Sequence, residues 1–305
     1  MRAAVLGCVL VFASGVGRAQ QTTAAPPATD SAKPQSAATT ALTQDQIREL
    51  FRQVADKDLE NDKKQRDYTF TERDVEHKLD GRGRIKSTET KTYEIMELYG
   101  EAVRRLIAKN DQPLSASDAR KEEQKIRKLM DKRKNESDKD REKRLQKEEK
   151  DREEGRKFVR EVADAYNFRL AGIQAVEGRE TYIIDAGPRP GYRPRLKDAW
   201  ILPKFRFRAW IDRDESQWKK IDVECIDTVS IGLFLVRLHK GSRATIEQTR
   251  VNDEVWLPQH IVVKADARVA LLKGFNIDAD VTFRDYKKFR SEAKIVSMGE
   301  TQEPR

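Results

Sequence analysis

The sequence is poor in the residues that most catalytic and metal sites use. It contains two cysteines, three histidines and few aromatic residues, which make up 7% of the chain. No histidine or cysteine lies three or four residues from His77, His239 or His260, and we therefore expect no metal site. Glycine-rich phosphate-binding motifs and the G-x-S-x-G motif of hydrolases are also absent. We therefore expect that the protein is not an enzyme and carries no cofactor.

Paired cysteines and long apolar runs are missing as well. Beyond the first 20 residues, Cys225 is the single cysteine, so the mature chain cannot form an internal disulfide. We expect Cys225 to be a small core residue. No segment in that part of the chain reaches the ~18 apolar residues that a membrane-spanning helix needs.

The first 19 residues predict a signal peptide. Arg2 supplies the positive charge, residues 3–16 are small and apolar, and residues 17–19 match a small-x-small cleavage site. An uncleaved N-terminal anchor and lipid attachment at Cys8 are the alternatives. Attachment at Cys8 is disfavoured because only seven residues precede it, which leaves no apolar segment upstream. We therefore expect export to the periplasm.

Charge is abundant and its balance is basic. Charged residues make up 37% of the chain, and the net charge of +9 falls to +7 when Arg2 and Arg18 leave with the signal peptide. Such a balance suits nucleic acid or an anionic lipid surface. The export signal argues against nucleic acid, so we expect no nucleic-acid partner.

The chain divides into segments of different composition. Residues 20–41 are rich in Ala, Thr, Pro and Ser and predict a disordered linker, and residues 293–305 predict a disordered tail. Between them, residues 42–114 predict an N-terminal helix, with Thr43 as its N-cap, and the first strands of a sheet. An Asp-Gly turn at residues 80–83 joins two of these strands as a hairpin.

Residues 115–157 predict a highly charged helical insertion. Between residues 120 and 157, 29 of 38 positions are charged, and opposite charges often lie three or four residues apart. We expect one long helix that is solvated on most sides and largely free of tertiary contacts. The alternative is an arm that binds an envelope protein or lipid headgroups.

Residues 158–292 predict an antiparallel sheet with one apolar face. The strand at 275–289 alternates apolar and polar residues, and other segments share this period of two. Asp212, Asp214 and Glu215 fall at a hairpin turn and are expected to be solvated. The alternation places nine apolar residues on one concave face, which we interpret as the lining of a ligand cavity: Phe207, Ile211, Ile221, Val223, Ile261, Val263, Ile277, Val281 and Phe283.

Several of these segments resemble a known family. "FRAWIDRDESQWKKIDVEC", "EVWLPQHIVVKA" and "FNIDADVTFRDYKKF" occur in an order similar to that of the outer-membrane lipoprotein-sorting proteins, the LolA/LolB-like group. The resemblance covers residues 160–290 and implies an α+β fold, a half-open antiparallel β-barrel with helices across its concave face. It also implies a lipid or a lipoprotein acyl chain as the ligand. The charged segment at 115–157 departs from the family, and no lipid-contacting residue can be carried over.

Two functions therefore compete. The first is an exported protein that binds or carries a lipid in an apolar hollow of the curved sheet. The second is a structural or signalling protein of the cell envelope that has the same fold and a filled hollow. Lipid that purifies with the protein would distinguish them.

Overall fold

The computed structural model describes residues 42–80, 83–99, 101–231, 236–269 and 274–289. The predicted signal peptide at 1–19, including Cys8, the linker at 20–41 and the tail at 293–305 lie outside these residues.

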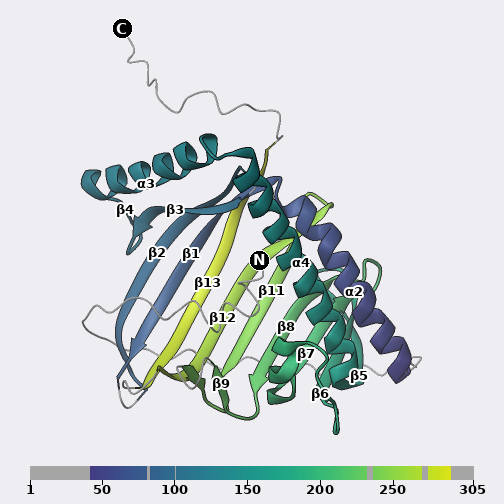
Figure 1. Cartoon of the computed structure of the whole chain (residues 1–305). Coiled ribbons are helices and arrows are strands. Elements are labelled where there is room, and N and C mark those ends of the chain that lie inside the picture. Colours follow the sequence, from purple (N-terminus) through teal and green to yellow (C-terminus); the bar gives the residue numbers. More distant parts are fainter. Residues whose placement is uncertain (1–41, 81–82, 100, 232–235, 270–273, 290–305) are drawn as a thin grey trace.

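One large antiparallel sheet dominates the described residues, and it is curved and unclosed (Figure 1). Its strands follow the order β4-β3-β2-β1-β13-β12-β11-β8-β7-β6-β5, with β9 and β10 paired beside β12. The strands are β1 (Tyr68–Leu79), β2 (Ile85–Leu98), β3 (Glu101–Lys109), β4 (Gln112–Pro113), β5 (Tyr166–Val176), β6 (Arg179–Pro188), β7 (Phe205–Asp212), β8 (Trp218–Cys225), β9 (Val229–Ile231), β10 (Val236–Leu238), β11 (Arg243–Val251), β12 (Val255–Val269) and β13 (Gly274–Lys288). The α+β class and the curved antiparallel sheet are as the sequence predicts.

Short turns join most neighbouring strands, so the pairing is largely local in sequence. The predicted hairpin of β1 and β2 is present, and so is that of β7 and β8, in which Phe207 lies opposite Val223. One pairing joins strands that are far apart in sequence, because β1 lies beside the last strand, β13. Residues 66–108 are therefore part of the same sheet as the C-terminal strands.

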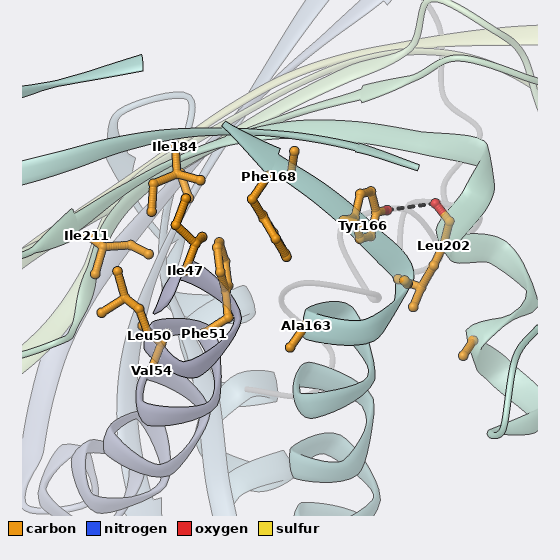
Figure 2. Packing of buried hydrophobic residues seen from close by; sticks show 14 residues of the cluster. Ile47, Leu50, Phe51, Val54, Ala163, Tyr166, Phe168, Ile184, Leu202 and Ile211 are labelled. Atoms are coloured by element: carbon orange, nitrogen blue, oxygen red, sulfur yellow. Dashed lines mark hydrogen bonds between the residues drawn. The ribbon is translucent and has the colours of Figure 1, made fainter. Parts of the chain in front are cut away.

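Helix α2 (Gln44–Gln65) lies across one face of this sheet, which we call the inner face (Figures 1 and 2). Its start is set by a capping box, in which the Thr43 hydroxyl accepts from the Gln46 backbone and the Gln46 side chain accepts from the Thr43 N–H. The buried residues of α2 pack on Phe168, Ile184 and Ile211 of the sheet. They recur at helical spacing and are Ile47, Leu50, Phe51 and Val54.

Side-chain amides attach α2 to strand backbone at both ends. Near its start, the Gln44 amide exchanges two hydrogen bonds with the backbone of Phe168, on the edge strand β5. Near its end, Asn61 donates to the Trp256 carbonyl at 2.7 Å and accepts from the Trp256 N–H at 2.7 Å. Gln65 donates to the same carbonyl at 2.6 Å. The helix is therefore fixed from β5 to β12.

The charged segment differs from the sequence prediction in two ways. It forms two helices, α3 (Ala116–Lys134) and α4 (Asp138–Ala165), instead of one. It also makes tertiary contacts, so the expected freedom from them is wrong. The few apolar residues of α3 share one face, and Ile126 is buried against Leu98 and Val103. Helix α4 lies beside α2 (Figure 1), where Arg160 pairs with Asp56. That the segment is an insertion stays a prediction.

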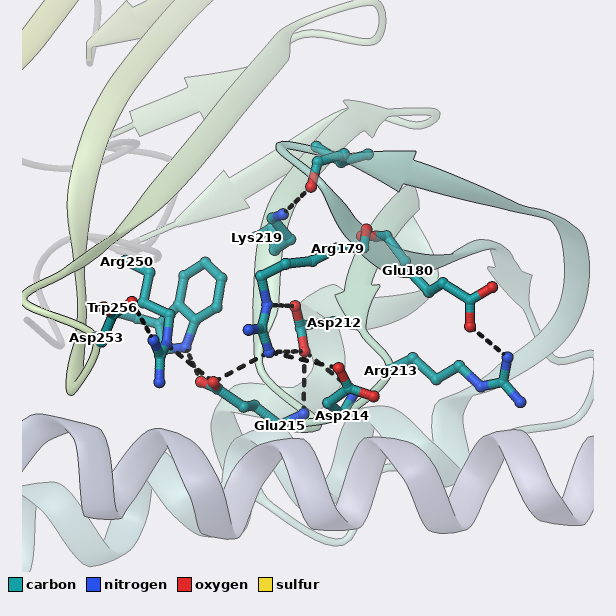
Figure 3. Close-up of polar contacts among 12 residues, drawn as sticks. Arg179, Glu180, Asp212, Arg213, Asp214, Glu215, Lys219, Arg250, Asp253 and Trp256 are labelled. Carbon is teal, nitrogen blue, oxygen red and sulfur yellow. Dashed lines mark hydrogen bonds and ion pairs between the residues drawn. The ribbon is translucent and has the colours of Figure 1, made fainter.

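The turn between β7 and β8 is also more ordered than the sequence predicts. Asp212 is fully buried, and it accepts hydrogen bonds from Arg179 at 2.5 and 2.9 Å and from two backbone N–H groups of the turn (Figure 3). Arg179 also contacts Glu215, which accepts from the Trp256 indole at 2.7 Å. Burial alone would raise the pKa of Asp212, but the Arg179 and backbone donors hold it below its ordinary value.

Replacing Asp212 with alanine should destabilise the fold strongly. The change removes the fully buried acceptor of the Arg179 guanidinium and of two turn N–H groups, and Arg179 keeps only its contacts with Glu215 and Asp214. It should cost ~3 kcal/mol of unfolding free energy in urea titration. Asp214→Ala in the same turn is the control and should cost under ~1 kcal/mol, because that side chain is 74% exposed. Equal losses for the two variants would show that the buried pair is not what holds the turn.

Candidate functional site

The nine residues predicted to line a cavity all lie on the inner face. Cross-strand partners share a face, and the register runs from Phe207 and Val223 through Ala244 and Val263 to Ala279. The neighbouring row contains Ile221, Ile246, Ile261 and Val281. These rows cross the sheet from β7 to β13, so the inner face is apolar over that whole width.

The structure divides these nine residues between two packed clusters. Phe207, Ile211 and Ile221 pack in the cluster that α2 covers. Val223 is half-buried between Phe207 and Ala244. The other five belong to a second cluster with Phe70 and Tyr286, and they are Ile261, Val263, Ile277, Val281 and Phe283. The first three therefore pack with α2. The five residues of the second cluster are buried too, between 2% and 9% exposed, but no residue of α2 belongs to that cluster. That the nine residues line a cavity stays a prediction, and the second cluster is the candidate ligand site.

The second cluster lies on the part of the inner face beyond the two long helices. In Figure 1, α2 and α4 lie over the side of the sheet that holds β5 to β8, while β13 and β1 lie to one side of them. Helix α2 packs on β5 and β12, and α4 packs on α2 and the 3-10 helix η2 (Lys197–Lys204). Three small residues, Ala265, Ala267 and Ala279, are buried in the same cluster.

At β1 the inner face changes from apolar to charged within one strand. The residues of β13 that face inward lie directly opposite charged residues of β1. The four pairs are Phe283 with Glu72, Val281 with Asp74, Ala279 with Glu76, and Ile277 with Lys78. An apolar surface with a charged border matches an amphiphile, which has an apolar chain and a polar head.

Arg104 of β3 organises this charged border. Its guanidinium donates to Glu72 and, at 2.7 Å, to Asp74, and it lies 4.0 Å above the Tyr93 ring. The second oxygen of Asp74 is buried and has no hydrogen-bond partner among the described residues. Burial, and then the nearby charge of Asp74, raises the pKa of Glu72 to about 7. The two carboxylates thus share one arginine, and one of them gains a proton near neutral pH.

This charged border was not predicted from the sequence. Glu72, Asp74 and Glu76 recur at every second position of the segment 66–80, which is the strand period. That period was available as a signal, but alternation alone does not say which face of the strand points inward. The pairing of β1 with β13 decides it.

A shallow cavity of about 290 Å³ opens at one end of β12 and β13. Its lining includes the polar residues Lys240, Asp266 and Asn276. Ile277 is the predicted cavity residue that it contains. The cavity therefore touches the second cluster only at Ile277 and Ala265.

Neither a metal site nor a membrane-spanning helix is found in the described part of the chain. There, the His, Cys, Asp and Glu side chains form no group of three that could hold a metal ion. None of the helices is long and apolar enough to cross a membrane. His260 lies on the outer face and contacts Glu247 at 3.3 Å and Asp280 at 3.0 Å.

Comparison with solved structures gives matches at 8 to 13% identity. A lipoprotein-sorting protein domain from Vibrio parahaemolyticus is 8% identical, with a TM-score of 0.34, and covers 80% of this chain and 95% of its own. A LolA superfamily protein from Nitrosomonas europaea is 9% identical, with a TM-score of 0.24, covering 82% and 95%. The complex of MucA and MucB from Pseudomonas aeruginosa matches at 13% identity and a TM-score of 0.21, covering 78% and 98%.

No protein-family model matches the sequence, and comparison with curated proteins also gives no match.

Replacing Glu72 with glutamine should change how stability depends on pH. The pKa of Glu72 in the folded protein lies above its ordinary value of 4.5, so the native state binds this proton more tightly than the unfolded chain. Ionised Glu72 therefore destabilises the fold above about pH 7, and the penalty disappears as the pH falls towards 4.5. Relative to Glu72→Gln, the wild type should gain on the order of 2 kcal/mol of unfolding free energy between about pH 8 and about pH 5.

Urea unfolding of both proteins at the two pH values measures this change. Glu180→Gln, which alters an exposed pair with Arg213, is the control and should differ from wild type equally at both. A difference between wild type and Glu72→Gln that does not vary with pH would contradict the arrangement of Glu72, Asp74 and Arg104 described above.

Proposed function

We propose that this protein binds a lipid, or the acyl chain of a lipoprotein, on the second cluster of the inner face. The observation that carries this proposal is the contiguous apolar cluster of β11, β12 and β13, which contains no residue of α2 and lies beside the charged residues of β1. An acyl chain laid on this surface would gain about 25 cal/mol for each Å² of apolar area removed from water. The predicted signal peptide supports a site of action in the periplasm.

The charged border supports an amphiphilic ligand over a purely apolar one. An acyl chain lying across Ala279 and Val281 would bring its polar end to Asp74 and Glu76. Arg104 already neutralises part of this charge, and the second oxygen of Asp74 is a buried acceptor without a hydrogen-bond partner among the described residues. A head that offers a hydrogen-bond donor suits this position best.

The packing of α2 on the first cluster favours a second function. There α2 fills the inner face, and Phe51 stacks on Phe168 with ring centroids 4.6 Å apart. A protein whose inner face is filled throughout would act through its surface, as a structural or signalling component of the cell envelope. The charged helices α3 and α4 would then be the partner-binding element.

Val281→Phe separates the two functions. If the second cluster binds acyl chains, the larger side chain should occupy the surface, weaken binding of a fluorescent fatty acid at least tenfold, and change stability by less than ~1 kcal/mol. If the cluster is a filled core, the extra volume should cost ~1–3 kcal/mol of unfolding free energy. Fluorescence titration and urea unfolding of the purified protein measure both quantities.

Val262→Phe is the matched control, because Val262 is the neighbour of Ile261 on β12 and points to the outer face. It should leave probe binding unchanged. Mass spectrometry of lipid extracted from the purified protein gives an independent readout. Strong destabilisation by Val281→Phe, with no probe bound to the wild type and no extracted lipid, would contradict the lipid-binding function. It would favour a protein whose inner face is filled.

A further inference from the structure

Four lysines form an exposed line along α4, which we call the lysine stripe. Lys139, Lys143, Lys147 and Lys150 are separated by four, four and three residues, a spacing that places their side chains on one face of a helix. All four are exposed. No ion pair joins any of them to another described residue.

The opposite side of α4 is fixed to the body of the protein. Arg144, Glu148 and Arg152 lie about half a turn away from the stripe and are partly buried. Arg144 donates to the Tyr99 carbonyl at 3.1 Å, and Arg152 lies 3.7 Å from Asp62 of α2. Because these contacts prevent α4 from rotating, the stripe faces away from the sheet.

The carboxylates near the stripe are already engaged. Asp140 accepts from the Ser137 hydroxyl at 2.8 Å, Glu142 accepts from Gln146 at 3.0 Å, and Glu149 pairs with Arg152 at 3.0 Å. The Ser137 hydroxyl and the Gln146 amide are neutral, so Asp140 and Glu142 keep their charge. Residues 139–150 contain six cations and four carboxylates, which leaves an excess of two positive charges over roughly 16 Å of helix.

We propose that the lysine stripe of α4 docks this protein on an anionic lipid bilayer. Protein interfaces are enriched in arginine and aromatic residues and depleted in lysine, and the stripe has the reverse composition. Lysine is a compact point charge on a flexible stem, which suits a diffuse field of headgroups better than a shaped partner. Leu145, the exposed large apolar residue of α4, lies off the stripe.

This docking does not depend on the proposed function. It requires only that the stripe meet a negatively charged surface, whether or not the inner face holds an acyl chain. In Figure 1 the start of α4 lies at the end of the sheet where α3 crosses, away from the β1–β2 and β10–β11 turns. The docked end is therefore distinct from the end that carries the shallow cavity.

Co-sedimentation with vesicles tests the proposal. The protein should bind vesicles made of equal parts phosphatidylglycerol and phosphatidylcholine, should not bind phosphatidylcholine alone, and should lose affinity as salt is added. One lysine near an anionic surface strengthens binding roughly fivefold, so Lys139→Gln, Lys143→Gln and Lys147→Gln together should weaken it about 100-fold. The variant with Lys139→Arg, Lys143→Arg and Lys147→Arg keeps the charge and should bind vesicles as the wild type does.

The control is a triple variant with the same change of net charge elsewhere, Lys86→Gln, Lys240→Gln and Lys264→Gln. Lys240 and Lys264 line the shallow cavity, and Lys86 is the second residue of β2. All three are exposed, and their loss should leave vesicle binding nearly unchanged. Circular dichroism verifies that α4 is intact in each variant.

An equal loss in the control variant would overturn the proposal, because net charge alone would then explain binding. So would wild-type binding by the stripe variant, or equal binding to neutral vesicles. Fatty-acid probe binding should be the same in wild type and stripe variant, which keeps this test separate from that of the inner face.

Discussion

The attachment of α2 across the sheet determines which part of the inner face is available. The helix is tied to β5 by Gln44 and to β12 by Asn61 and Gln65, each through hydrogen bonds to strand backbone. Bonds from side-chain amides to buried backbone satisfy groups that would otherwise cost free energy unpaired. With both ends fixed, the apolar side of α2 can cover β5 to β8 and cannot extend over β13 and β1.

The distribution of polarity on the inner face follows from that limit. Under α2 the residues are aromatic and large, and Phe51, Phe168 and Phe207 contact one another with the face and edge geometry of packed rings. Beyond α2 the inner face combines alanines with large residues such as Phe283 and Ile277, and the next strand, β1, is charged. The step from apolar to charged therefore falls between β13 and β1.

Local patterns in the sequence were enough to predict much of this fold. The period of two in β7 and β8, the Asp-Gly turn between β1 and β2, and the capping residue Thr43 each have local physical causes, so they could be predicted. The environment of Asp212 could not, because its partner Arg179 lies 33 positions earlier and reaches it only through the strand pairing. The inward direction of Glu72 and Asp74 has the same origin, since it depends on the pairing of β1 with β13. The division of the nine predicted cavity residues between two clusters has a related cause, since sequence alternation does not show where a helix will lie.

The arginines and the lysines of α4 lie in different environments, and each kind of residue accounts for part of the high charge of this helix. The arginines Arg144, Arg152 and Arg160 form ion pairs or backbone hydrogen bonds that hold α4 against α2 and the β2–β3 turn. The planar guanidinium is suited to such contacts because it donates several hydrogen bonds in a fixed geometry. The lysines of the stripe make no such contacts with described residues and project into solvent. A helix that needed only solubility would not require its arginines and lysines on opposite sides. The division gives α4 one side that fixes its orientation and another that is left free to meet a charged surface.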